Sequence, residues 1–167
     1  MQLDPAAFEA LFSSHGARMK SLALNMLGNR ADAEDAVQEA FLRAYRSRDR
    51  YRETAALYTW MTRILINTCH DIGRSRAKRR GETPLEEGPL PELALPGSDH
   101  PLHLALVAAV RRLSPIYREV FLLTEVEGYT HREVGEILEI PEGTSKARLF
   151  EARRQLRIAI RGPEIPS

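Results

Sequence analysis

The segment THREVGEILEIPEGTSKARLFEARRQLRIAI (130–160) decides the fold, because it has the pattern of a helix, a tight turn and a second helix. Its first residues predict a capping box, in which the side chains of Thr130 and Glu133 each accept a hydrogen bond from the other residue's backbone N–H. The run 139–143 contains a proline and a glycine and breaks the first helix. A last helix is expected over 144–160, so the segment is typical of a helix-turn-helix.

The expected second helix is strongly basic, and Glu151 is its one acidic residue. Its basic residues are Lys146, Arg148, Arg153, Arg154, Arg157 and Arg161. Duplex DNA is a dense line of negative charge, and a helix fits the major groove with its N-terminal residues near the base edges. Phe150 is unusual on a solvated face, and it could touch a thymine methyl group there. The segment predicts DNA binding, with a merely solvated amphipathic helix as the alternative.

The middle of the chain has the composition of a linker. Residues 81–101 hold five of the ten prolines and three of the ten glycines, together with five acids and no Lys or Arg. Prolines break helices, and a stretch of this length is too long for an ordinary loop inside one compact domain. We therefore expect two small domains, 1–80 and 102–162, joined by this flexible Pro-rich linker and followed by a tail, 163–167.

Length and composition bound the remaining possibilities. The chain has 167 residues, a net charge of +1 and one cysteine, Cys69, which excludes an internal disulfide. No run of apolar residues is long enough to span a membrane, and the N-terminal sequence has no signal-peptide pattern. We expect a cytoplasmic protein without membrane insertion, bound cofactor or metal site.

The N-terminal half is expected to be entirely helical, with helices over 5–27, 30–47 and 55–77. Asp4 and Pro5 are typical of a helix start, while Gly28 and Asn29 tolerate the left-handed conformation that ends a helix. Apolar residues follow helical spacing in the first helix, among them Phe8, Leu11 and Phe12, and form a stripe on one face of the second, with Phe41 and Tyr45. In the third helix, Trp60 is expected to face inward.

The third helix carries a polar face of Arg63, Asn67, His70 and Arg74, spaced 4, 3 and 4 residues apart. Five basic residues lie within 74–80, and three aromatic residues lie just before the polar face: Tyr51, Tyr58 and Trp60. Bases taken out of a duplex need cations for the backbone and aromatic platforms for the base. The alternative is a solvated helix end that suits the helix dipole, with Trp60 in the core.

The second helix begins with the acidic stretch DAEDAVQEAFLRAY (32–45). Asp32, Asp35 and Glu39 are expected on one face, which could dock a basic partner helix together with neighbouring apolar residues. Acids near a helix N-terminus also complement its dipole, and this explains Asp32 but not Glu39, which lies in the second turn.

This stretch, followed by YTWMTRILINTCHDIGR (58–74) and EGYTHREVGEILEIPEGTSKARLFEARRQLR (127–157), resembles the extracytoplasmic-function (ECF) sigma factors of bacterial RNA polymerase. The resemblance covers about residues 7–160. It implies an all-α fold with a σ2 bundle of three or four helices and a σ4 helix-turn-helix bundle. It also implies a non-enzymatic factor that binds core polymerase, directs it to promoters and promotes DNA opening.

The resemblance implies three sets of contact residues and no catalytic residue. Docking on the clamp helices of the β′ subunit is implied for Asp32, Asp35, Gln38, Glu39, Leu42 and Arg43. Contact with the −10 element, with base capture by the loop 51–55, is implied for Tyr51, Arg52, Trp60, Arg63, Asn67, Asp71, Arg74 and Arg76. Contact with the −35 element is implied for Arg132, Thr144, Lys146, Ala147, Arg148, Phe150, Arg153 and Arg154. The implied partners are core polymerase, including the β flap, promoter DNA and an anti-sigma factor.

Some positions depart from the family's pattern. Ser145 stands where an apolar residue is usual, Ala147 where serine is usual, and Gly135 where alanine is usual. Glu151 stands where several relatives have a basic residue. An acid that faces phosphates lowers DNA affinity, so the presence of Glu151 leaves undetermined which −35 sequence the chain prefers.

Two other classes of protein remain as alternatives. A free-standing helix-turn-helix regulator would bind a palindromic operator as a dimer without polymerase. An enzyme would need a pair such as His100 with His103, or His70 with Asp71. The first pair lies in the linker and is poorly held, while the second is adjacent on a helix and points apart, so an enzyme is disfavoured.

Overall fold

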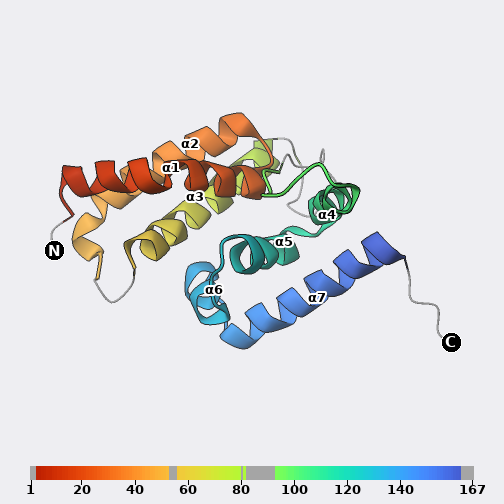
Figure 1. Cartoon of the computed structure of the whole chain (residues 1–167). Coiled ribbons are helices and arrows are strands. Elements are labelled where there is room, and N and C mark those ends of the chain that lie inside the picture. The colour runs from red at the N-terminus through yellow and green to blue at the C-terminus, as the bar shows by residue number, and fades with distance from the viewer. Residues whose placement is uncertain (1–2, 53–55, 80, 82–92, 163–167) are drawn as a thin grey trace. The chain divides into compact units, whose positions relative to one another are not determined.

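The computed structural model describes residues 3–52, 56–79, 81 and 93–162. These residues form seven α-helices, one 3-10 turn and one π-helical segment, and none of them lies in a strand (Figure 1). The expected all-α fold is confirmed. The chain divides into two compact units, unit 1 (Met1–Gly88) and unit 2 (Pro89–Ser167). Most of the expected linker and the whole expected tail lie outside the described residues.

Unit 1 is a bundle of α1 (Pro5–Leu27), α2 (Arg30–Arg46) and α3 (Leu57–Arg79), in which each helix packs against the other two. Asp4 is the N-cap of α1, and its Oδ1 accepts a hydrogen bond from the backbone N–H of Ala7 at 2.9 Å. Gly28 ends α1 in the left-handed conformation, at φ 70°. Both ends were predicted because capping depends only on local sequence. The fully buried side chains of the core include Met19, Leu22, Met61, Leu65 and Ile66.

Phe12 and Tyr45 belong to the apolar residues found at helical spacing, but they are exposed, at 48% and 43%. Each forms an edge-to-face pair across α1 and α2, Phe12 with Phe41 at 5.4 Å and Tyr45 with Phe8 at 5.7 Å between ring centroids. These rings line an open groove of about 730 Å³ on the outside of the bundle. These rings lie on the apolar side of their helices, but they stay outside the core because buried alanines and Val37 of α2 already fill it.

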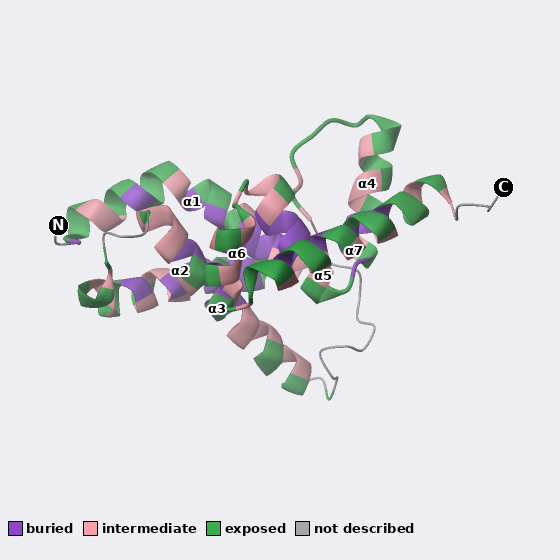
Figure 2. Cartoon of the chain, turned by 90° about the horizontal axis from the view of Figure 1, so that it is seen from below, coloured by how far each residue is buried: buried purple, intermediate pink, exposed green. Residues whose placement is uncertain are grey.

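Unit 2 contains α4 (Pro101–Arg112), α5 (Pro115–Phe121), the π-helical segment η2 (Leu122–Val126), α6 (His131–Leu138) and α7 (Glu142–Arg161). Helices α4, α5 and α6 all pack against α7. Buried residues run along the inner side of the helices and exposed residues along the outer side (Figure 2). Arg118 is held in this core, where its guanidinium donates hydrogen bonds to the carbonyl oxygens of Arg111 and Leu113. Burial lowers the pKa of this guanidinium.

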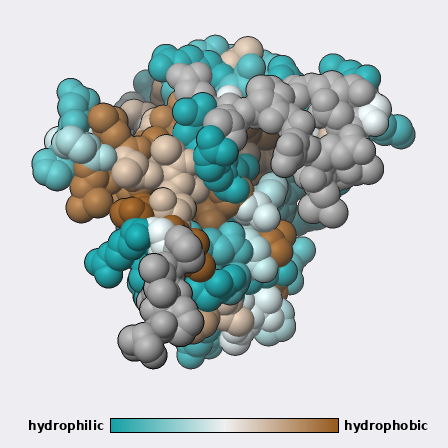
Figure 3. All heavy atoms as spheres, turned by 90° about the vertical axis from the view of Figure 1, so that its right-hand side faces the viewer, coloured by the Kyte–Doolittle hydropathy of each residue, from teal (hydrophilic) through white to brown (hydrophobic). Residues whose placement is uncertain are grey.

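Large apolar side chains also reach the surface of unit 2. Leu102 is 59% exposed, Leu104 54% and Ile158 39%. Apolar patches beside hydrophilic ones are visible on the face of the molecule that Figure 3 presents. No helix among the described residues combines the length and the apolar character that crossing a membrane requires.

The predicted capping box begins α6, and two special backbone positions, Gly135 and Glu139, shape the turn that leads from α6 to α7. The Oγ1 of Thr130 accepts from the N–H of Glu133 at 3.2 Å, and Glu133 Oε2 accepts from the N–H of Thr130 at 2.8 Å. Glu139 ends α6 at φ 57°, a left-handed conformation that suits glycine. A Cβ added at Gly135 would lie only 2.7 Å from the carbonyl oxygen of Ile140, so this glycine lets the turn fold back closely.

We predict that Glu139→Gly raises the free energy of unfolding of unit 2 by about 0.5–1 kcal/mol. This is the cost of the left-handed conformation for a residue with a Cβ, less the chain entropy that glycine adds to the unfolded state. Thermal denaturation measures the change. Glu136→Gly, at an exposed position inside α6, is the matched control and should lower stability by about 1 kcal/mol. A loss of stability in Glu139→Gly would contradict the strain at this position.

Candidate nucleic-acid interfaces

One side of α7 is buried and the other is exposed, which defines the first candidate surface. Ser145, Leu149, Ala152 and Leu156 are buried against the rest of unit 2. The DNA-facing side of α7 predicted from sequence is exposed, and its exposed members are Lys146, Ala147, Phe150, Arg153 and Arg154. Phe150 is 67% exposed, more than any other large apolar side chain described. Phe150 is therefore not part of the core of unit 2, and it lies among basic residues on the accessible side of α7.

The other predicted members of this surface lie at its edges. Arg132 is on the first turn of α6, where its side chain is 82% exposed, and its Nε lies 3.7 Å from Glu136 Oε1. Thr144 and Arg148 are half-buried on the flank of α7. The eight predicted −35 residues thus lie on α6 and α7, where six are exposed and two are half-buried.

A polar contact joins α6 to α7 under this surface. Ser145 is fully buried, and its Oγ lies 2.8 Å from Nδ1 of His131, the first residue of α6. Sequence reasoning noted Ser145 only as a departure from an apolar pattern. The capping position of Thr130 placed His131 at the start of α6, but no sequence signal paired it with a residue fourteen positions later.

The α3 helix presents the second candidate surface. Arg63, Asn67 and Arg74 are exposed and His70 is half-buried, so the predicted polar face lies at the surface. The opposite residue, Leu65, is fully buried. The arrangement leaves an amide and two guanidinium groups along one accessible side of the helix.

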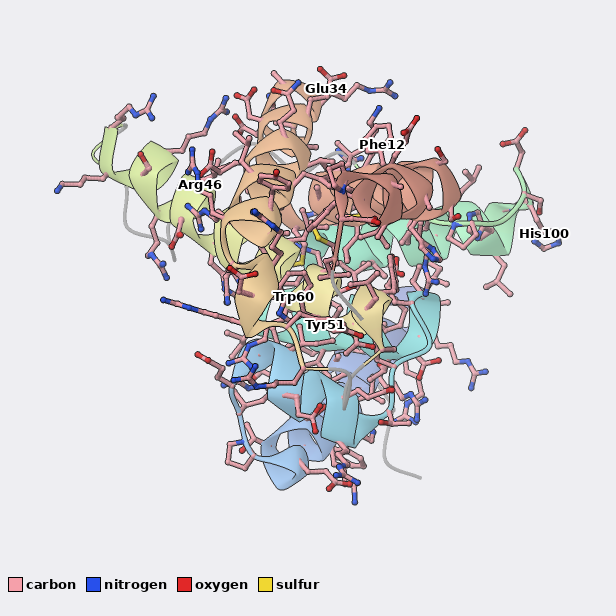
Figure 4. All side chains as sticks on the ribbon, turned by 90° about the vertical axis from the view of Figure 1, so that its left-hand side faces the viewer. Phe12, Glu34, Arg46, Tyr51, Trp60 and His100 are labelled. Carbon is pink, nitrogen blue, oxygen red and sulfur yellow. The ribbon has the colours of Figure 1, made fainter. Side chains whose placement is uncertain are left out.

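Tyr51 and Trp60 form an aromatic pair beside this face. Their ring centroids are 5.2 Å apart, and the two side chains lie close together in Figure 4. Both are half-buried, so Trp60 lies at the edge of the core rather than inside it. Arg52 is exposed, whereas residues 53–55 of the predicted base-capturing loop, like Arg80 of the basic run, lie outside the described residues.

Residues predicted to contact two different partners are bonded to each other across α2 and α3. Arg43 Nη1 lies 2.7 Å from Asp71 Oδ2, and Arg76 Nη2 lies 2.6 Å from Asp32 Oδ1. The hydrogen bond from Arg43 is the main reason that the pKa of Asp71 is lowered and that of Arg43 is raised. Glu39 and Arg74 extend the network, because Glu39 accepts from Arg43 and Arg74 donates to Asp71.

The position of Asp32 corrects one sequence prediction. Its side chain is only 8% exposed, so it does not share the open face expected for it with Asp35 and Glu39. The N-terminal turn of α2 directs Asp32 toward α3, where Arg76 reaches its carboxylate. The open side of α2 is formed instead by the exposed Asp35, Gln38 and Leu42, with Glu39 half-buried beside them.

We predict that Arg76→Ala lowers the free energy of unfolding of unit 1 by about 1–3 kcal/mol, because it leaves the Asp32 carboxylate buried without its cation. Denaturation of the full chain by urea measures the loss. Lys78→Ala removes an exposed cation from the same end of α3 and should change stability by less than about 0.5 kcal/mol. Equal effects of the two substitutions would contradict a structural role for the Asp32–Arg76 pair.

Among the described residues, no group of three His, Cys, Asp or Glu side chains is arranged to hold a metal ion. The candidate surfaces consist of polar, charged and aromatic side chains on α2, α3, α6 and α7 and on the segment before α3 that holds Tyr51 and Arg52. Such surfaces suit binding to nucleic acid and to protein.

Comparisons with known proteins agree with this architecture. Residues 11–80 match the family Sigma-70 region 2, and residues 103–156 match Sigma-70, region 4. The RNA polymerase sigma factor CarQ of Myxococcus xanthus is 33% identical over 152 residues, which cover 90% of this chain and 87% of CarQ. The ECF RNA polymerase sigma factor SigM of Mycobacterium tuberculosis is 32% identical over 157 residues, covering 92% of this chain and 76% of SigM.

A solved structure has the same fold. The sigma factor RpoE from Bartonella quintana, crystallised with the anti-sigma factor NepR, superimposes with a TM-score of 0.75 at 21% identity. The superposition covers 94% of this chain and 98% of that one.

Proposed function

The chain belongs to the extracytoplasmic-function (ECF) RNA polymerase sigma factors, and we propose that its two units divide promoter recognition between them. It is an alternative sigma factor that directs promoter transcription. Sigma factors are transcription initiation factors rather than enzymes. Unit 1 binds core polymerase and the −10 element, unit 2 binds the −35 element, and the factor works in the cytoplasm.

Core polymerase docks on the open side of α2. Asp35, Gln38 and Leu42 provide an acidic, an amide and an apolar contact there, and all three are exposed. This mixture suits the clamp helices of the β′ subunit as partner. Asp32 and Arg43, which the family resemblance also assigns to docking, act by holding α2 against α3 through their ion pairs.

The polar face of α3 binds the single strand of the −10 element as the duplex opens. Unstacking a base costs a few kcal/mol, and stacking on aromatic rings with cation contacts to the backbone offsets about 1–3 kcal/mol per base. Tyr51 and Trp60 supply the aromatic surface, while Arg63 and Arg74 supply the cations. Asn67, exposed between them, has the donor and acceptor that a base edge requires.

The exposed side of α7 enters the major groove of the −35 element. Ala147 is small and allows close approach, and Phe150 meets a thymine methyl group. Lys146 and Arg148 lie near the base edges, while Thr144 and Arg132 lie at the N-terminal ends of α7 and α6, where phosphates bind. Arg153 and Arg154 reach the phosphates further along the groove.

Neither unit has a large DNA-binding surface, so each binds weakly when it acts alone. Holding both on polymerase turns the second contact into an intramolecular event, which raises overall affinity by about 10²–10⁴ without any new interaction. The β flap is proposed as the polymerase element that holds unit 2. An anti-sigma partner is proposed as well, since RpoE of B. quintana was solved with one.

The observation that carries this function is the exposed Phe150, surrounded by basic residues, on the outer side of a helix whose other side is buried. Run-off transcription with purified core polymerase on a genomic library tests it. The expected result is initiation at a specific set of start sites that core polymerase alone does not use. Failure to initiate at any specific site would contradict the proposed function.

In the same assay we predict that Asn67→Ala lowers heparin-resistant open complexes about tenfold, because a base contact is worth about 1–3 kcal/mol. Binding to core polymerase should stay unchanged, since Asn67 lies on α3 and away from the docking side of α2. Normal open complexes with this variant would contradict the role of Asn67.

We also predict that Asp35→Ala combined with Glu39→Ala weakens core polymerase binding at least tenfold, as measured by co-purification and fluorescence titration. Glu9→Ala combined with Asp49→Ala removes the same charge from exposed positions elsewhere in unit 1 and should bind normally. Docking through α2 is wrong if the two double variants bind core polymerase equally.

A further inference from the structure

Two arginines on the DNA-facing side of α7 are already occupied by carboxylates of unit 2. Arg153 is paired with Glu125, a residue of the π-helical segment η2. Arg154 is paired with Glu151 one turn earlier on α7, through Nε to Oε2 at 2.9 Å and Nη2 to Oε1 at 2.5 Å. Each arginine available for a DNA phosphate therefore has a competing anion from the same unit.

The Glu151 carboxylate is held strongly in its charged form. Besides the two bonds from Arg154, its Oε1 accepts a hydrogen bond from Gln155 Nε2 at 3.0 Å. Arg154 and then Gln155 lower the pKa of Glu151 to about 2. The carboxylate is ionised at any pH at which the protein works, and it follows Phe150 directly in the helix.

Glu125 comes from a different element than its partner. It lies 28 residues before Arg153 in sequence, and the packing of the α5–η2 region against α7 brings the two side chains together. Its side chain is 37% exposed and that of Arg153 is 56% exposed, so both groups remain accessible to solvent and to DNA. The pair can open when a stronger anion arrives.

We propose that Glu125 and Glu151 are affinity-limiting residues, which compete with DNA phosphate for Arg153 and Arg154 and keep unit 2 from binding DNA on its own. The inference rests on the proposed function, because it concerns the same −35 surface. Taken together, the two acids and two arginines carry no net charge. A duplex that approaches α7 must displace both carboxylates and then tolerate them close to its phosphates.

This competition is useful for a factor that must bind DNA only as part of a larger complex. Binding to duplex of any sequence rests on phosphate contacts, and the genome offers a vast excess of such sites. A chain whose Arg153 and Arg154 had no competing carboxylates would be bound to these non-specific sites. When polymerase holds unit 2 beside promoter DNA, the raised effective concentration overcomes the competition, and base contacts from α7 select the site.

The test uses the full chain with Glu125→Gln, Glu151→Gln or both, because glutamine keeps the size of glutamate and loses its charge. Fluorescence anisotropy measures binding of each chain, without polymerase, to a duplex of random sequence at several salt concentrations. Each single substitution is expected to tighten binding about three- to tenfold at low salt, and the double substitution more than either single one. The gain should shrink as salt screens the charges.

Asp99→Asn is the matched control, since it removes one exposed acid from unit 2 before α4 and should change DNA binding less than twofold. Thermal denaturation of every variant checks that the fold is kept, and Glu151→Ala provides a second neutral side chain at the same position. Unchanged or weaker DNA binding in the folded glutamine variants would overturn the proposal. Weaker binding in particular would mean that the carboxylates orient the arginines for phosphate.

Run-off transcription with the same variants separates this proposal from the proposed function. If the wild-type chain supports specific initiation and the glutamine variants do not bind free DNA more tightly, only the competition is wrong. If the wild-type chain does not support specific initiation, the −35 assignment fails whatever the variants do. The expected combination is normal start-site selection by wild type, with greater inhibition of the variant holoenzyme by competitor DNA of random sequence.

Discussion

The burial of one side of α7 is the constraint on which the proposed −35 surface depends. Ser145, Leu149, Ala152 and Leu156 are fixed against the other helices of unit 2, and the residues between them are therefore turned outward. Because successive residues of a helix point in different directions, the burial of Leu149 turns the next residue, Phe150, toward solvent. Three features join α6 to α7: the close approach of Ile140 to Gly135, the left-handed backbone of Glu139, and the contact from His131 to Ser145. We expect a helix held in this way to bind DNA with little further ordering, which keeps the entropic cost of binding low.

In unit 1, packing between helices also fixes the proposed contact surfaces, and ion pairs between α2 and α3 add to it. The α2 helix faces the proposed polymerase site and α3 faces the proposed single strand, and the two helices are joined by Arg43–Asp71 and by the buried Asp32–Arg76 pair. The first pair is largely solvated and contributes little to stability, whereas the second is costly to break because Asp32 is buried. Because α2 and α3 are joined rigidly, polymerase bound at the proposed site on α2 would also fix the position of α3. The two units thus share one design, a rigid helix pair that presents a narrow polar and aromatic stripe.

The features that local sequence determines were predicted well. The start of α1 at Asp4, its end at Gly28 and the capping box at Thr130 depend on residues within a few positions of one another. The exposed Lys146, Ala147 and Phe150 were predicted from the helix-turn-helix pattern, whereas the family resemblance implied Arg153 and Arg154, which are also exposed. Contacts between elements were not predictable in this way: nothing local pairs Asp32 with Arg76, Glu125 with Arg153 or His131 with Ser145. The exposure of Phe12 and Tyr45 was not predictable either, because spacing gives the apolar face of a helix but not the depth at which the core is already filled.

We expect each of the two DNA contacts to be weak alone and effective only on polymerase. The affinity of the chain for one promoter, measured with and without core polymerase, decides this. The measurement is a titration of a promoter duplex and a scrambled duplex of equal length, at one salt concentration, by the chain alone and by the assembled holoenzyme. We expect the chain alone to bind both duplexes weakly and about equally, and the holoenzyme to bind the promoter at least 10²-fold more tightly than the scrambled duplex. Tight and sequence-specific binding by the chain alone, particularly as a dimer, would contradict this expectation and favour a free-standing regulator.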